Sequence, residues 1–329
     1  MLKGKKVLVT GGSGFIGSHL VEEMVKIGAR VKVLVPYTLN KNKEDLVYLE
    51  KGVLSKLDIV YGNIADLVCV KDVMKGAEIV FNLAAIVSIP YSYSHPREVV
   101  DVNTIGTLNM LTAARETDNI ERFIQTSTSE VYGTARYVPI DEKHPLQPQS
   151  PYSASKIAAD SLALSFCNSF NLPVVVVRPF NTFGPRQSER AVLPTIICQA
   201  LKQDIIAIGS VTPRRDFTYV KDTVNGFIKA AESKKGVGEV INLGTGKDYS
   251  IGESIEIIGS LLHKKLKVSV KEERKRPPKS EVMRLNADNR KAKKLLGWSP
   301  EYSFKDGLKE TIKFISKNLS RYEPDKYII

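Results

Sequence analysis

The chain has 329 residues, of which 43% are hydrophobic and 26% are charged. This length favours a large domain with a smaller partner over one small core, and the mixed composition argues against extensive disorder. The formal net charge of +12 is spread over expected surface helices, and no nucleic-acid-binding module is evident, so we expect no nucleic-acid partner. A phosphate-rich small substrate explains the charge as well as simple solvation of the surface does.

A membrane protein is also not expected. No apolar run approaches the roughly 20 residues that span a bilayer. The first residues lead into a strand and a glycine turn instead of a signal-peptide core, so we expect a cytoplasmic protein. The three cysteines, Cys69, Cys167 and Cys198, are far apart and lack metal-ligand spacing, which favours free thiols over disulfides or a metal site.

Strand and helix patterns alternate along the first half of the chain. Residues 5–10 read as a buried strand, 14–27 as an amphipathic helix and 31–36 as a second strand, and further strands are expected at 57–61, 78–82, 121–126 and 173–178. The intervening helical stretches are long enough for right-handed crossovers. This order predicts an α/β protein with a doubly wound parallel Rossmann sheet and a smaller C-terminal α/β lobe.

The domain division follows from the point where this alternation fades. We assign residues 1–178 to the Rossmann domain with the catalytic residues, and 179–316 mainly to a substrate lobe, from which segments can return to the Rossmann domain. Residues 317–329 read as a polar tail.

A glycine-rich turn, TGGSGFIG at residues 10–17, follows the first strand and opens the first helix. Gly11 permits the tight turn, Gly14 allows a pyrophosphate to approach the backbone, and Gly17 allows the helix to pack closely on the strand. In this context a dinucleotide site is much better supported than an ordinary turn. The predicted cofactor contacts here are Gly11, Ser13, Gly14, Phe15, Ile16 and Gly17.

The second strand ends without the carboxylate that usually holds the adenosine ribose of NAD. Tyr37 stands in that region, and Asn40, Lys41 or Lys43 can meet a 2′-phosphate, so NADP is favoured modestly over NAD; loop lysines that face water are the alternative. Two later strand ends add candidate cofactor contacts. These are Asn63 and Ile64, where Asn63 can instead form a turn, and the residues Leu83, Ala84 and Ala85, whose small side chains let a cofactor pass.

Tyr152 and Lys156 are four residues apart at the start of an apolar-periodic helix, so both lie on one face, where Lys156 can lower the pKa of the tyrosine. The segment STSEVYG at 127–133 follows the fifth strand and adds hydroxyl groups and one carboxylate at the carboxyl edge of the sheet. A lone Y-x-x-x-K is common by chance. Its order after the glycine turn and this strand end favours a catalytic constellation.

These motifs, together with NLAA, RPFNTFGP and RRDFTYVKD, resemble the extended short-chain dehydrogenase/reductase family over nearly the whole chain. Within it, AAIVSIPYSYSHP and STSEVYGTARYVPIDEKHPLQPQSPYSASK are most similar to nucleotide-sugar 4,6-dehydratases that act on nucleotide-linked N-acetylglucosamine in legionaminic and pseudaminic acid pathways. Family dehydratases carry a Thr-Asp-Glu triplet before V-Y-G, and 4-epimerases lack its glutamate. Here the triplet is Thr128, Ser129 and Glu130, which implies dehydration and leaves open which group protonates the leaving hydroxyl.

The resemblance implies a mechanism and a substrate site. Tyr152, assisted by Thr128, removes the proton of the C4 hydroxyl while a tightly bound cofactor takes the C4 hydride. Glu130 then removes the C5 proton, water leaves from C6, and the hydride returns to C6. The resemblance also implies that Ser88 contacts the hexose and that the diphosphate is bound by Asn181, Arg215 and Arg276. Arg190 is a weaker candidate for the diphosphate. The alternative for Arg276 is that it belongs to a run of charged residues that face water.

The first hypothesis is therefore a UDP-N-acetylglucosamine 4,6-dehydratase. The alternatives are a GDP-linked substrate, a 5,6-dehydratase that releases a 5,6-ene, a nucleotide-sugar 4-epimerase, and a dinucleotide-binding protein without catalysis. The helices expected at 98–116 and 151–170 resemble those that form a four-helix bundle in family homodimers, so a homodimer is expected.

Overall fold

A computed structural model describes residues 1–37 and 44–322 of the chain. The larger lobe is built on a parallel sheet with the strand order β10-β6-β5-β4-β1-β2-β3, which confirms the predicted Rossmann topology. Its strands are β1 (Lys6–Thr10), β2 (Arg30–Val35), β3 (Leu57–Tyr61), β4 (Ile79–Asn82), β5 (Arg122–Thr126), β6 (Val174–Pro179) and β10 (Val240–Leu243). Six of these strands lie in the segments expected from the sequence, and β10 returns to the sheet from within 179–316.

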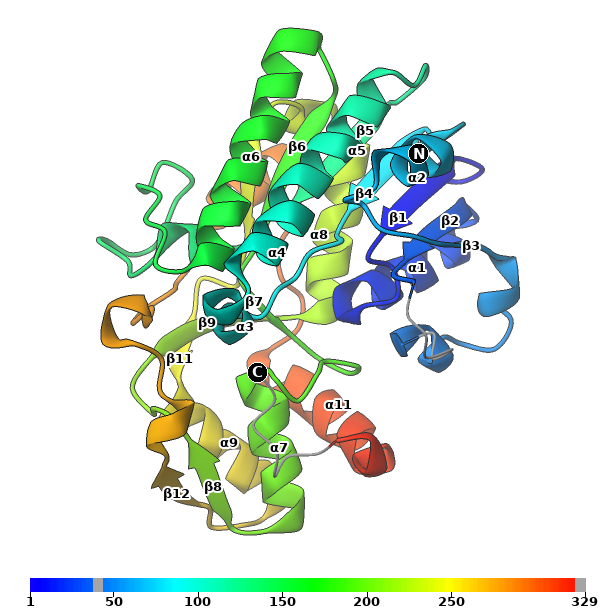
Figure 1. Cartoon of the computed structure of the whole chain (residues 1–329). Coiled ribbons are helices and arrows are strands. Elements are labelled where there is room, and N and C mark those ends of the chain that lie inside the picture. Colours follow the sequence, from blue (N-terminus) through cyan, green and yellow to red (C-terminus); the bar gives the residue numbers. More distant parts are fainter. Residues whose placement is uncertain (38–43, 323–329) are drawn as a thin grey trace.

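Both faces of this sheet are covered by helices. On one side lie α1 (Phe15–Ile27) and α8 (Val220–Glu232), and on the other α2 (Leu67–Met74), α5 (Gly106–Arg115) and α6 (Pro151–Phe170), as Figure 1 shows. Successive strand residues enter different cores: Val7 and Val9 belong to one apolar cluster and Leu8 to the other. The central strands therefore carry apolar residues toward both faces, because helices cover both sides of the sheet.

The helix expected at 98–116 is continuous but irregular. It consists of α4 (Pro96–Val100), a π-helical turn η3 (Asp101–Ile105) and α5, preceded by the short α3 (Ile89–Ser94). Asn103 in the π turn accepts a hydrogen bond from the Ile86 N–H at 2.8 Å and donates to Ser155 Oγ at 3.0 Å. This side chain ties the helix to the segment after β4 and to α6.

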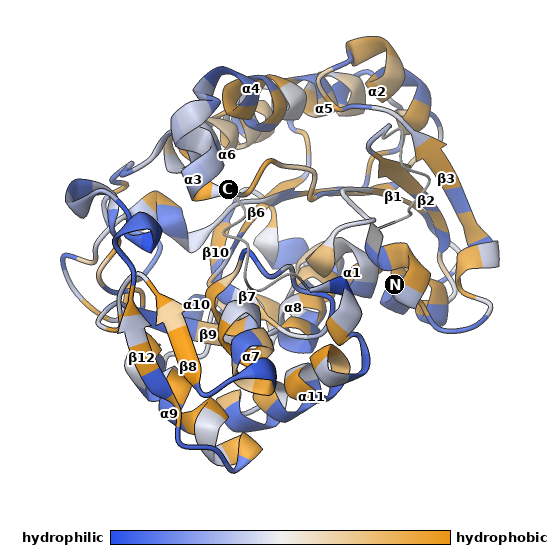
Figure 2. Cartoon of the chain, turned by 60° about the horizontal axis from the view of Figure 1, so that its bottom comes forward, coloured by the Kyte–Doolittle hydropathy of each residue, from blue (hydrophilic) through white to orange (hydrophobic). Residues whose placement is uncertain are grey.

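The smaller lobe contains two further sheets. Strands β11 (Asp248–Ser250), β9 (Arg214–Tyr219) and β7 (Asn181–Phe183) form one, and β12 (Lys267–Val270) pairs with β8 (Ile205–Ile208) in the other. Around them lie α7 (Val192–Lys202), α9 (Ile251–Leu262), α10 (Arg290–Leu296) and α11 (Phe304–Lys317). Figure 2 shows hydrophobic and hydrophilic residues on the same helices of this lobe, as expected where a helix covers a core on one side.

The chain continues to pack against the protein beyond α11. Tyr322 is 6% exposed and belongs to the larger apolar cluster, so the first part of the segment predicted as a polar tail is anchored. Within residues 1–37 and 44–322, none of the helices is long and apolar enough to cross a membrane.

Candidate active site

The glycine turn between β1 and α1 has the shape that the sequence predicts. Gly11 has φ +66°, and a Cβ atom there would lie 2.8 Å from the backbone nitrogen of Ala84. A Cβ on Gly17 would lie 2.1 Å from the carbonyl oxygen of Gly11, whereas one on Gly14 would meet only that oxygen, at 3.4 Å. Gly14 starts α1 and carries no side chain to cap it, so the first N–H groups of the helix are left for an anion.

A buried polar chain fixes the sheet edge beside this turn. Thr10 donates from Oγ1 to Asn82 Oδ1 at 2.7 Å, and Asn82 Nδ2 donates to Gln125 Oε1 at 2.9 Å. Thr10 Oγ1 also accepts the N–H of Ala84 at 3.1 Å, in the segment Leu83–Ala85 predicted to contact the cofactor. The ends of β1, β4 and β5 are therefore held in register where a dinucleotide would lie, which the sequence analysis did not anticipate.

The remaining predicted cofactor residues differ in their surroundings. Tyr37 is 77% exposed after β2, and Asn40 and Lys41 lie outside the described residues. Asn63 Oδ1 accepts the N–H of Ala65 at 2.9 Å, which is the turn-forming arrangement considered for it. Ile64 is 3% exposed, so its side chain packs in the core.

Tyr152 and Lys156 are both buried in the first two turns of α6. Ser150 caps this helix by accepting the N–H of Ser153 at 3.1 Å. The Lys156 ammonium donates to the carbonyl oxygen of Thr126 at 2.5 Å, and burial lowers the pKa of Lys156 to about 8 although the Asp160 carboxylate opposes the shift. The helix thus presents a tyrosine and an easily neutralised lysine at the carboxyl end of β5.

The expected lowering of the Tyr152 pKa by Lys156 is not found. Burial raises the pKa of Tyr152, the charges of Glu130 and Asp160 act in the same direction, and the hydrogen bond with Thr128 opposes them. The physical reason is that the Lys156 ammonium is directed to the Thr126 carbonyl, while removal of the phenol from water dominates.

The triplet Thr128, Ser129 and Glu130 lies beside this pair, at the start of the short helix η4 (Ser129–Tyr132). Thr128 caps η4 by accepting the N–H of Glu130 at 3.2 Å, and Ser129 is 2% exposed. The Glu130 charge raises the pKa of Tyr152 and also favours the charged form of Arg215. One carboxylate therefore stands within electrostatic reach of the tyrosine and of the substrate-lobe arginine.

The structure brings two predicted phosphate contacts together. Arg215 on β9 is 6% exposed and donates from Nη2 to Glu281 Oε1 at 3.2 Å, and Arg276 Nη1 lies 3.7 Å from the same oxygen. Two guanidinium groups share the Glu281 carboxylate, and guanidinium groups held together in this way suit phosphate oxygens. The sequence analysis missed Glu281, although it lies five residues after Arg276.

Three other substrate candidates are more scattered. Asn181 Oδ1 on β7 is buried and has no hydrogen-bond partner in the part of the chain described, so it is free for a ligand. Ser88 caps α3 by accepting the N–H of Tyr91 at 3.3 Å. Arg190 is exposed, and no contact within 1–37 and 44–322 joins it to Arg215 or Arg276.

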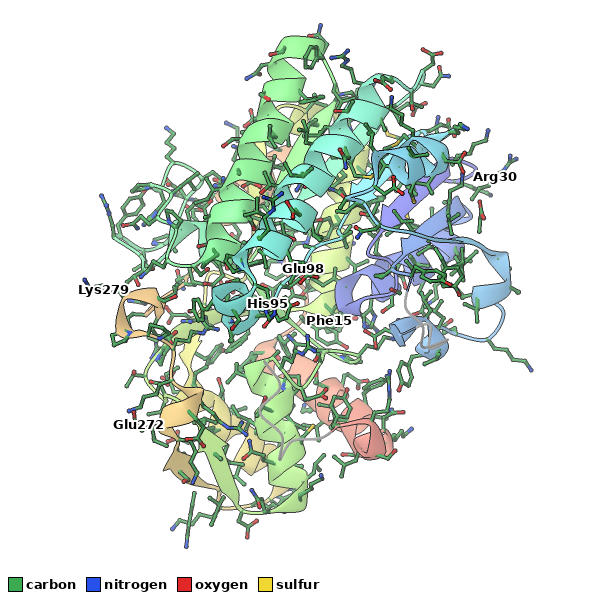
Figure 3. The ribbon with its side chains drawn as sticks, viewed as in Figure 1. Phe15, Arg30, His95, Glu98, Glu272 and Lys279 are labelled. Atoms are coloured by element: carbon green, nitrogen blue, oxygen red, sulfur yellow. The ribbon has the colours of Figure 1, made fainter. Side chains whose placement is uncertain are left out.

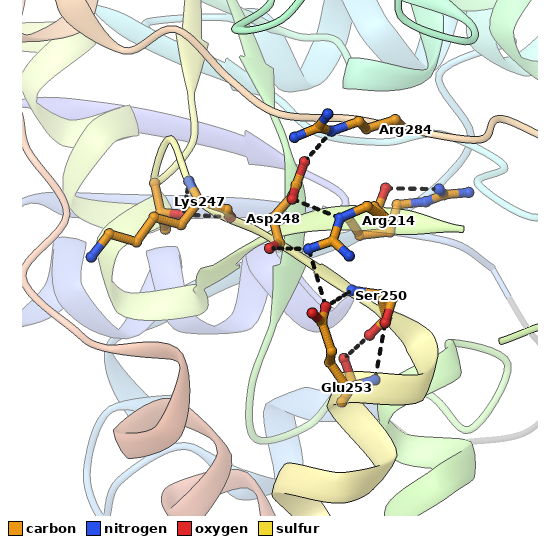
Figure 4. A network of polar contacts seen from close by, with 9 residues as sticks. Arg214, Lys247, Asp248, Ser250, Glu253 and Arg284 are labelled. Carbon is orange, nitrogen blue, oxygen red and sulfur yellow. Dashed lines mark hydrogen bonds and ion pairs between the residues drawn. The ribbon is translucent and has the colours of Figure 1, made fainter. Parts of the chain in front are cut away.

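The segment after Arg276 contacts the larger lobe, because Gln149 Nε2 donates to the Lys279 carbonyl oxygen at 2.8 Å and the hydroxyl groups of Tyr93 and Ser280 lie 2.6 Å apart. Figure 3 labels Lys279 in this segment, His95 at the end of α3, Glu98 in α4 and Phe15 at the start of α1. Next to Arg215, Arg214 donates from Nε to Asp248 Oδ1 at 2.9 Å, and Arg284 Nε donates to Oδ2 of the same carboxylate at 2.5 Å (Figure 4). This network holds β9 and β11 against the chain that follows Glu281.

Comparison with known proteins places this architecture in a family. The family model described as GDP-mannose 4,6 dehydratase matches residues 8–311. A putative UDP-glucose 4-epimerase of Methanocaldococcus jannaschii is 32% identical over 95% of this chain and 99% of its own length, and a UDP-N-acetyl-alpha-D-glucosaminuronate decarboxylase of Bacillus cytotoxicus is 34% identical over 94% and 97%. The structure of DesIV, a dTDP-glucose 4,6-dehydratase from Streptomyces venezuelae with NAD and TYD bound, superposes with a TM-score of 0.87 at 27% identity, covering 98% of this chain and 100% of that one.

The chain therefore belongs to the extended short-chain dehydrogenase/reductase family of nucleotide-sugar dehydratases, epimerases and decarboxylases. Relatives of similar identity carry names for different reactions, so sequence identity alone does not select the reaction.

Proposed function

We propose that the protein is a nucleotide-sugar 4,6-dehydratase whose preferred substrate is UDP-N-acetylglucosamine. The observation that carries the proposal is the Glu130 carboxylate, which follows Thr128 by two residues and lies within electrostatic reach of both Tyr152 and Arg215. Exchange of configuration at C4 needs the tyrosine and a hydride carrier. Loss of water additionally needs a base for C5, and Glu130 supplies one.

A dinucleotide fits the Rossmann lobe because the turn at Gly14 is open, the N-terminus of α1 is uncapped by a side chain, and the sheet edge beside Ala84 is rigidly held. A nicotinamide cofactor held there would supply the hydride acceptor for oxidation at the sugar C4 and the hydride donor for C6. We propose NAD as the first choice because DesIV was solved with NAD, although the sequence pattern after β2 tilts toward NADP.

In the proposed reaction the phenolate form of Tyr152, which the hydrogen bond with Thr128 favours against burial, takes the proton of the 4-hydroxyl group, and Thr128 also holds that hydroxyl by hydrogen bonding. Lys156, one helical turn after Tyr152, keeps a positive charge below about pH 8. Oxidation at C4 makes the C5 proton acidic, and Glu130 removes it. Because Ser129 stands where other dehydratases carry an aspartic acid, we assign the protonated Glu130 as the donor that lets the C6 hydroxyl leave as water.

The diphosphate of the substrate would bind the buried Arg215 and the neighbouring Arg276. Both guanidinium groups already face one carboxylate oxygen of Glu281, so they are arranged for paired oxygen ligands. The unpaired Asn181 Oδ1 offers an acceptor for a sugar or ribose hydroxyl.

We also propose that the protein is a homodimer and that it works in the cytoplasm. The helices α5 and α6, which pack against each other, would form the dimer interface. Light scattering of the purified protein tests the dimer.

The test is incubation of the purified protein with UDP-N-acetylglucosamine and, separately, with GDP-N-acetylglucosamine, without added cofactor and then with NAD or NADP. The proposal predicts loss of one water from the UDP sugar, with NMR signals of a 4-keto-6-deoxy product. A 5,6-ene identifies the alternative dehydratase, and loss of water from the GDP sugar alone changes the nucleotide. An unchanged mass with inverted C4 makes the protein an epimerase, and no change under any condition refutes the proposed reaction.

A further inference from the structure

A buried carboxylate lies directly behind the proposed catalytic pair. Asp160 follows Lys156 by one turn of α6 and is 1% exposed. Its Oδ2 atom accepts from Ser127 Oγ at 2.7 Å and from Arg178 Nε at 3.0 Å, and Arg178 Nη2 lies 3.0 Å away. Its Oδ1 atom is buried without a hydrogen-bond partner in the described parts of the chain. Burying an unneeded carboxylate is costly, so this position demands a reason.

These contacts join the elements that carry the reacting groups. Ser127 immediately precedes Thr128, so its bond to Asp160 anchors the start of the Thr128–Glu130 segment on α6. Arg178 on β6 continues the network by donating from Nη1 to Tyr132 Oη at 2.9 Å, at the end of η4. Both ends of the loop that presents Glu130 are therefore tied, directly or through Arg178, to one carboxylate.

Asp160 also determines the charge around Lys156. The charged and titratable groups packed here are Lys156 and Tyr152 from α6, Arg178 from β6, and Glu130 and Tyr132 from η4. Asp160 is the acid whose charge acts on the Lys156 ammonium and opposes the loss of its proton through burial. Burial raises the pKa of Asp160, while Arg178 and the Ser127 hydroxyl favour its ionised form.

We propose that Asp160 is a positioning residue of the reaction: its carboxylate holds the Thr128–Glu130 segment against α6 and keeps the buried Lys156 ammonium charged at neutral pH. Without it, Arg178 and Lys156 would be two buried cations with no anion between them. The kinetic part of this inference rests on the proposed dehydratase function, and the electrostatic part does not.

The activity-independent test is a double-mutant cycle of Asp160→Asn and Lys156→Met, measured by urea unfolding of the full chain at about pH 7 and about pH 10. At the lower pH the double variant should lose less free energy of unfolding than the sum of the losses of the two single variants. The reason is that each single substitution alone already breaks the attraction between the two charges. At the higher pH, where Lys156 is neutral, the effects should add. Additive effects at both pH values, or a coupling that does not change with pH, overturn the electrostatic role.

The kinetic test compares the pH profile of kcat/KM for the wild type, Asp160→Asn and two controls. In Asp160→Asn the negative charge is lost, so the alkaline limb, which is the pH range where kcat/KM falls as the pH rises, should move about one to three pH units lower. Asp160→Glu, which keeps the charge, should retain the wild-type limb even if it is less stable. Tyr132→Phe, which cuts the same network beyond Arg178, should lower stability and leave the limb in place.

The two proposals fail in different ways. If the wild type releases water from no sugar, the proposed function is wrong and the unfolding cycle alone decides the role of Asp160. If the wild type is an active dehydratase and Asp160→Asn keeps its alkaline limb, the function stands and the positioning role is refuted.

Discussion

The sharpest stability prediction concerns Asp216 on β9, next to Arg215. Its side chain is completely buried and accepts four hydrogen bonds. Oδ1 accepts from Thr245 N at 2.8 Å and Thr245 Oγ1 at 2.7 Å, and Oδ2 accepts from Gly246 N at 2.8 Å and Ala287 N at 3.1 Å. One carboxylate thus connects β9, the loop after β10 and the segment before α10.

The substitution Asp216→Asn replaces one acceptor oxygen by an NH2 group of almost the same size. Either orientation of the amide turns that group toward two donors, and at least one of them is a backbone N–H that has no alternative partner. The NH2 group and the backbone N–H that it faces are then two unsatisfied buried groups, and at about 1–3 kcal/mol for each we expect a loss of about 2–6 kcal/mol in the free energy of unfolding. That is a large part of the roughly 5–15 kcal/mol that stabilises a typical domain.

The assay is urea unfolding followed by circular dichroism, with Thr245→Val as the matched control. The control removes the hydroxyl, which also accepts the exposed N–H of Lys247 at 3.2 Å, and leaves the carboxylate with three backbone donors, so it should cost about 1 kcal/mol. A loss below about 1 kcal/mol for Asp216→Asn would refute the reasoning, because it would mean that the donors find other acceptors.

The other predictions concern the site itself. Tyr152→Phe should abolish oxidation of the sugar, whereas Glu130→Gln should stall after oxidation and leave absorbance of the reduced cofactor; normal turnover by Glu130→Gln removes the case for dehydration. For the wild type, kcat/KM should fall as the pH rises above about 8, because the Lys156 ammonium loses its proton there. A kcat/KM that stays constant from pH 7 to about 10 contradicts this role of Lys156. Gly17→Ala should destabilise the fold, since its Cβ would meet the Gly11 oxygen at 2.1 Å, whereas Gly14→Ala should fold normally and bind NAD more weakly in a fluorescence titration.

Features that depend on neighbours along the chain could be predicted from the amino-acid sequence. Alternating strands and helices, the glycine turn at 11–17 and the placement of Tyr152 and Lys156 in the first turns of one helix all follow from local sequence patterns, and the structure has them where they were expected. The helix at 151–170 agrees with its prediction because its cap, Ser150, and its stop at Asn171 are encoded next to it. Asp160 also lies within this helix, and its spacing of four from Lys156 was a signal that the sequence analysis did not use.

Contacts between side chains that are distant in the sequence could not be predicted in this way. The contact of Asp160 with Ser127 and Arg178 spans three elements, and that of Arg215 with Glu281 joins β9 to a segment 66 residues later. The same holds for β10, which pairs with β6 although it comes from the segment assigned mainly to the second lobe. The physical reason is that a local pattern shows which face of an element is apolar, whereas the partner of a buried charge depends on how whole elements pack.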